Sequence, residues 1–172
     1  MRQIDTAVIH CSDSFWGSAD IIRQWHLRRG WRDIGYHWVV LNGYTGPGKF
    51  DPDMNGRIEA GRSIDNDIYI DEGEEGAHAL GYNERSVGIC LIGGQEGTKT
   101  AFSLPQYWSA LMLVGTLKLQ IPDLQILGHN ETGSPKACPV IDMSLFRERV
   151  NTLLTGCLSY KFLKEDIAGR GI

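Results

Sequence analysis

The chain has 172 residues, enough for one domain with a buried core, and its 42% hydrophobic and 22% charged residues are typical of a globular protein. A formal net charge of −4 gives no electrostatic reason to expect a nucleic-acid partner. No apolar stretch is long enough to cross a membrane, and the N-terminal run "MRQIDTAVIH" is too short for a signal peptide. We therefore expect synthesis in the cytoplasm and no membrane insertion.

The first predicted elements are a strand and an amphipathic helix. The β-branched and apolar run at 4–10 predicts a strand that ends on His10. Helical spacing of apolar residues predicts a helix over 21–30, with Ser18 or Asp20 as its N-cap.

A second strand and two irregular segments follow. Aromatic and β-branched residues predict a strand over 36–43. The density of Gly and Pro over 44–55 predicts a loop without regular structure, followed by a short strand over 57–62 that returns as a hairpin. The acidic, Gly-containing segment 65–75 is expected to be an irregular surface segment.

The second half repeats the alternation of strands and helices. The apolar run 86–94 predicts a central strand, and Ser103 is a candidate N-cap for the helix that follows it. The segment 121–129 predicts a strand that ends on His129, and a last helix is expected to end near Leu154. This order predicts a mixed α/β fold, with a central mixed β-sheet flanked by helices. We place one domain over 1–158 and a C-terminal tail over 159–172.

Four cysteines stand at Cys11, Cys90, Cys138 and Cys157, and none belongs to a C-x-x-C pair. This spacing excludes a compact four-cysteine zinc knuckle, and we expect no disulfide framework. Cys90 and Cys157 are expected to be buried as small apolar residues.

Two predicted strands end on a histidine, His10 and His129, and Cys138 follows nine residues after the second. Strand ends deliver side chains to pockets, and two imidazoles with one thiolate form a catalytic zinc ligand set that leaves the fourth position open. Alternation along the strand points Cys11 away from His10, which excludes it as a ligand. From the residues alone, a hydrogen-bonded histidine and a buried cysteine remain alternatives, as does a thiol nucleophile at Cys138 with a histidine base.

Five ordered blocks carry a resemblance that covers most of the chain. They are "VIHCSDS" (8–14), "IRQWHLRRGWRDIGYHWVV" (22–40), "GRIEAGR" (56–62), "GAHALGYNERSVGICLIGG" (76–94) and "GHNETGSPKACP" (128–139). Together they resemble the N-acetylmuramoyl-L-alanine amidases of the phage-lysozyme and peptidoglycan-recognition-protein family. The resemblance implies one Zn²⁺ per chain, held by His10, His129 and Cys138, and a catalytic domain that cleaves the amide between N-acetylmuramic acid and L-alanine.

The same resemblance implies roles for four further residues. Tyr36 matches a catalytic tyrosine that orients water, and Lys136 matches a catalytic lysine that stabilises the oxyanion. His78 and Asn83 match positions near the metal and along the peptide groove, so both are expected to bind substrate. His37 alternates with Tyr36 and is expected to be structural.

These features predict a peptidoglycan hydrolase that acts as a phage or prophage endolysin. We expect a monomer that reaches the wall from the periplasm after release. The alternatives are a non-catalytic muropeptide-binding protein and an intracellular amidase that recycles soluble muropeptides. The segments 44–55 and 65–75 look expanded relative to small phage relatives.

Overall fold

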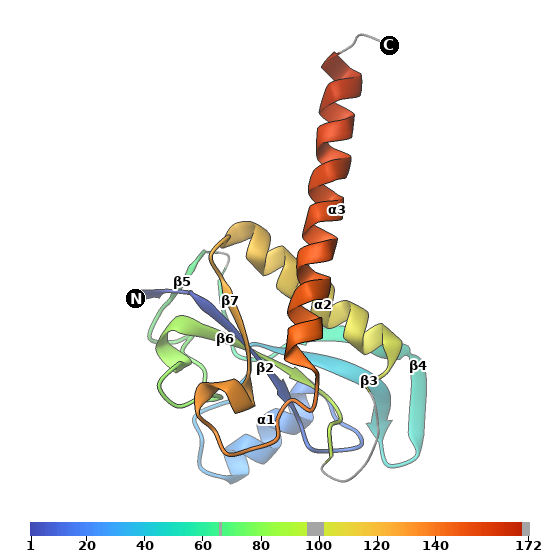
Figure 1. Cartoon of the computed structure of the whole chain (residues 1–172). Helices are drawn as coiled ribbons and strands as arrows, with labels where there is room; N and C mark the ends of the chain where they lie inside the picture. The colour runs from blue at the N-terminus through green and yellow to red at the C-terminus, as the bar shows by residue number, and fades with distance from the viewer. Residues whose placement is uncertain (66, 96–101, 170–172) are drawn as a thin grey trace.

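A mixed five-stranded sheet organises the chain, of which the computed structural model describes residues 1–65, 67–95 and 102–169, with side chains up to residue 156 (Figure 1). The strand order is β4-β3-β6-β2-β7, and β3 pairs antiparallel with β4 while the other neighbours are parallel. The strands are β2 (Thr6–Cys11), β3 (Trp38–Gly46), β4 (Lys49–Ala60), β6 (Ser86–Leu91) and β7 (Gln125–Gly128), beside a small pair of β1 (Arg2–Gln3) and β5 (Tyr69–Ile70). The mixed sheet confirms the predicted fold class.

Helices cover both faces of this sheet (Figure 1). Helix α1 (Ala19–Arg28) packs on one face, and α2 (Leu104–Gln120) and α3 (Met143–Gly169) pack on the other. Successive residues of β3 serve the two cores in turn, because strand side chains alternate between faces. Val40 belongs to the α2 and α3 core, and Val39 and Leu41 belong to the α1 core.

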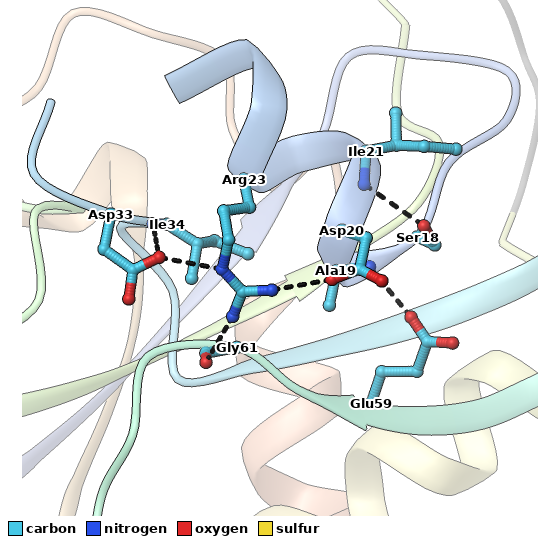
Figure 2. A network of polar contacts seen from close by, with 9 residues as sticks. All are labelled: Ser18, Ala19, Asp20, Ile21, Arg23, Asp33, Ile34, Glu59 and Gly61. Carbon is cyan, nitrogen blue, oxygen red and sulfur yellow. Dashed lines mark hydrogen bonds and ion pairs between the residues drawn. The ribbon is translucent and has the colours of Figure 1, made fainter. Parts of the chain in front are cut away.

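Helix α1 begins at a capped and anchored N-terminus. The Ser18 hydroxyl accepts a hydrogen bond from the Ile21 amide at 3.2 Å, so Ser18 is the N-cap rather than Asp20. The Ala19 amide donates to the Glu59 carboxylate at 2.8 Å, and this bond ties the helix start to β4 (Figure 2).

Arg23 links α1 to the turn that precedes β3 (Figure 2). Its guanidinium donates to the carboxylates of Asp20 at 2.7 Å and Asp33 at 2.8 Å, and to the carbonyl of Gly61 at 2.9 Å. Asp33 also accepts from the Ile34 amide at 2.7 Å. One side chain therefore joins the helix, the turn and the end of β4.

The prediction of an irregular loop over 44–55 was wrong, because β3 and β4 continue through this segment as a long hairpin. Three register shifts interrupt the pairing, and Gly43 and Gly56 take positive φ angles of 86°. Pro52 is tolerated because β4 is an edge strand and Pro52 lies at a register shift, where no residue of β3 is paired with it.

The predicted start of α2 was confirmed, and the predicted end of α3 was wrong. Ser103 caps α2 as predicted, and Gln106 completes a capping box. Helix α3 was expected to end near Leu154 but continues to Gly169. Within the described residues, no helix is long and apolar enough to cross a membrane.

Candidate active site

The ends of two neighbouring strands, β2 and β7, bring His10 and His129 side by side. His10 lies near the end of β2 on the face covered by α1 and is 1% exposed. β7 runs parallel to β2 with Ile9 opposite Gly128, so the residues that follow this pair are neighbours. His129 comes directly after β7 and begins the short 3-10 helix η2 (His129–Thr132).

The loop after η2 folds back and delivers Cys138 to the same place. Gly133 ends η2 with a φ of 85°, a left-handed conformation that glycine adopts without strain. The Asn130 amide then donates to the Cys138 carbonyl at 2.7 Å, which closes the loop. The Cys11 amide donates to the Cys138 sulfur at 3.2 Å, which ties the thiol to the end of β2.

His10, His129 and Cys138 form a group whose potential ligand atoms lie within 4.8 Å of one another. A tetrahedral zinc site has bonds of about 2.0–2.3 Å, which separates its ligand atoms by roughly 3.5 Å. The two-nitrogen and one-sulfur set suits zinc, and no fourth His, Cys, Asp or Glu of the described residues joins the group. The residues fit a zinc ion with one open position.

The electrostatics of the group favour the neutral imidazoles that bind metals. Burial lowers the pKa of His10 far below its usual value, and His78, His129 and the Lys136 ammonium lower it further. Burial and Lys136 also lower the pKa of His129. The neighbouring Cys11 thiol and burial raise the pKa of the Cys138 thiol. Both histidines therefore hold lone pairs at neutral pH.

His129 and Cys138 open onto a cleft of about 700 Å³. Part of its wall is α1, which sequence reasoning treated only as a packing element. Trp25 on this helix, Arg29 at its C-cap and Trp31 beyond it line the cleft. The i, i+4 spacing of Trp25 and Arg29 places both side chains on one side of the helix. This spacing is the sequence pattern that could have indicated that they line the cleft.

Tyr36 stands between the metal-ligand group and α1. Its ring centroid lies 5.1 Å from that of His10 and 5.5 Å from that of His26, and its side chain lines the cleft. His26 is held in turn by the Gly35 amide, which donates to its Nδ1 at 3.0 Å. Burial and the nearby thiols of Cys90 and Cys138 raise the pKa of Tyr36 well above its usual value, so the phenol keeps its proton.

Lys136 belongs to the same loop as Cys138 and lines the cleft as an exposed residue. Its positive charge contributes to the lowered pKa values of His10 and His129. Lys136 therefore adds a positive charge to the cleft onto which His129 and Cys138 open.

His78 and Asn83, expected to bind substrate, have mostly internal contacts. His78 is buried, with its Nδ1 3.1 Å from Nε2 of His10, and burial lowers its pKa to about 3. The Asn83 side-chain oxygen accepts from the amides of His78 and Ala79, both at 2.9 Å. Their contact with substrate stays a prediction. His37 is held by backbone atoms at both ring nitrogens, as expected of a structural residue.

Comparisons with known proteins identify the family of this chain. The profile of the N-acetylmuramoyl-L-alanine amidase family matches residues 1–140. The endolysin of Escherichia phage T7 is 35% identical over 158 residues, which cover 88% of this chain and 89% of that protein. The endolysin of Klebsiella phage KP32 is 34% identical over 154 residues, which cover 86% and 87%.

A solved structure shows the same fold. The N-acetylmuramoyl-L-alanine amidase LysC from Clostridium intestinale URNW superposes with a TM-score of 0.69 and 22% identity, and the match covers 87% of each chain. The fold and the residue group define a mixed-sheet amidase. From the family match, this chain belongs to the N-acetylmuramoyl-L-alanine amidase family.

Proposed function

We propose that this protein is a peptidoglycan hydrolase that cleaves the amide between N-acetylmuramic acid and the L-alanine of the stem peptide. The observation that carries the proposal is the convergence of His10, His129 and Cys138 beside an open cleft. One zinc ion per chain, held by these residues, would activate a water molecule and polarise the scissile carbonyl.

The other residues of the cleft supply orientation and charge. The protonated Tyr36 phenol hydrogen-bonds to the attacking water and fixes its direction. The Lys136 ammonium stabilises the negative charge that develops on the carbonyl oxygen. Water adds its oxygen to the lactyl carbonyl carbon, the carbon–nitrogen bond breaks, and L-alanine leaves as an amine that takes up a proton.

The biological setting that the relatives support is a phage or prophage endolysin. Endolysins of phages T7 and KP32 match this chain over most of their own length. We infer that the protein is made in the cytoplasm, acts on the wall from the periplasm after release, and works as a monomer.

The test is digestion of purified sacculi, with the release of peptides that carry a free L-alanine amine as the readout. The wild-type protein should release them, and His10→Ala and Cys138→Ala should not. If the wild type bound muropeptide but released no peptide, the protein would be a recognition protein and the proposal would be wrong. Cleavage of soluble muropeptides but not of intact sacculi would indicate a recycling enzyme.

A chelator separates the metal mechanism from a cysteine hydrolase. Both mechanisms need a Cys138 thiolate, as a zinc ligand or as a nucleophile, so the experiment and not the protonation of the thiol separates them. We expect the chelator to abolish activity and added zinc to restore it. Activity that survives complete metal removal would favour the thiol mechanism.

A further inference from the structure

A hydrogen bond joins the His78 side chain to the metal-ligand group. Its Nδ1 lies 3.1 Å from Nε2 of His10, and the two rings meet edge to face with centroids 5.1 Å apart. The other ring nitrogen of His78 is buried and has no hydrogen-bond partner among the described residues. His10 is therefore the side-chain hydrogen-bond partner that the described residues offer to His78, and the His37 ring packs edge to face against it with centroids 5.8 Å apart.

This contact decides which nitrogen of His10 is left for a metal ion. Since Nε2 of His10 is engaged by His78, Nδ1 is the ring atom that remains. A neutral imidazole that binds metal through Nδ1 carries its proton on Nε2, and that proton needs an acceptor. Nδ1 of His78 is at hydrogen-bond distance to accept it.

Contacts of the loop that carries His78 hold the imidazole ring in this position. Asn83 accepts the amides of both His78 and Ala79, which fixes the backbone at the ring's attachment point. Two glycines form the slot for the ring, because a Cβ at Gly88 would lie 2.6 Å from Cγ of His78 and one at Gly76 would lie 2.7 Å from its Cδ2. Any larger residue at either position would displace the ring.

We propose that His78 is a positioning residue that orients His10 and fixes its tautomer for metal binding, and that Asn83 holds His78 in place. This inference rests on the proposed zinc site. It gives both residues a role behind the metal ligand, in addition to the place of His78 in the wall of the cleft. Partners of this kind commonly change metal affinity by 10–100-fold when they are removed.

Zinc affinity, measured by competition with a chelator, gives the first test. His78→Leu removes the acceptor and should weaken zinc binding by about 10–100-fold. His78→Asn puts a side-chain oxygen where Nδ1 stood and should restore affinity close to that of the wild type. His37→Asn is the comparison variant: it alters a buried histidine whose hydrogen bonds go to the backbone of Glu74 and Gly88, although its ring also packs against that of His78. It should weaken zinc affinity far less than His78→Leu.

Nitrogen-15 NMR of histidine-labelled, zinc-loaded wild type gives the second test and needs no variant. We expect a proton on Nε2 of His10, zinc on its Nδ1, and an unprotonated Nδ1 on His78. Zinc on Nε2 of His10 would overturn the proposal, as would equal zinc affinity in His78→Leu and the wild type. Failure of His78→Asn to restore affinity in a folded protein would also overturn it. If the wild type itself binds no zinc, the proposed function fails instead.

Discussion

Tyr36 is a cleft residue whose proposed role can be separated from metal binding. It is outside the metal-ligand group, and its raised pKa keeps the hydroxyl as a hydrogen-bond donor. Tyr36→Phe should lower kcat by roughly 10²–10³-fold, the loss typical of removing one transition-state hydrogen bond. Zinc content should stay at the wild-type level.

The matched control for this substitution is Tyr44→Phe. Tyr44 lies on the β3–β4 hairpin and is 43% exposed, away from the metal-ligand group. We expect Tyr44→Phe to retain wild-type kcat on sacculi. A full rate for Tyr36→Phe, or its loss together with zinc, would contradict the role assigned to the phenol.

At the scale of elements, the sequence predicted the parts of the site that depend on strand ends. His10 and His129 each close a predicted strand, and their meeting required only that the two strands lie side by side. The contact between His78 and His10 depends on β6 being the other neighbour of β2, with Gly88 opposite Val8. No local pattern in the sequence predicts this pairing register between β2 and β6.

The hairpin shows why local rules failed at 44–55. Gly and Pro interrupt strands in general, and the rule was applied without knowing where the strand lies in the sheet. β4 is an edge strand, so Pro52 is tolerated, and the register shifts accommodate Gly43 and Gly56. The end of α3 was missed because the helix continues past Gly156, a residue type that commonly marks a helix end, to Gly169.

The Arg23 network predicts a pH dependence of stability. Burial alone raises the pKa of Asp33, but the bonds from Arg23 and from the Ile34 amide outweigh it, and the folded pKa is lowered. A lowered folded pKa stabilises the protein above the unfolded value of about 3.9, and this stability is lost as the pH falls through the folded pKa. Asp33→Asn should therefore lower the free energy of unfolding at pH 7 by about 1 kcal/mol or less.

The measurement is urea unfolding of both proteins from pH 7 down to pH 2. Below the unfolded pKa, the stability of Asp33→Asn should fall less steeply than that of the wild type. Asp20→Asn is the control on the same guanidinium, because the Asp20 side chain is 84% exposed and solvent screens its contribution. If the free energy of unfolding of Asp33→Asn and of the wild type fell equally steeply with pH, the Asp33 carboxylate would not contribute to the acid sensitivity.

At the scale of the whole molecule, the metal-ligand group joins distant parts of the chain. His10 lies in β2 near the N-terminus, and Cys138 lies in the loop that leads to α3. A ligand that binds only the folded state stabilises it by about 2.7 kcal/mol at 100 times its Kd. For a chain of this size, that corresponds to a rise in Tm of roughly 5–10 °C.

We expect this rise between chelator-treated and zinc-loaded wild type in a thermal unfolding experiment. Cys138→Ser should lose most of it, because the thiolate ligand is gone. Cys90→Ala should keep it, since Cys90 is buried in β6 and outside the group. His78→Leu should need a higher zinc concentration to reach the same Tm, because weaker binding requires more ligand for equal stabilisation. A zinc-dependent rise of equal size in wild type and Cys138→Ser would place the ion elsewhere on the molecule.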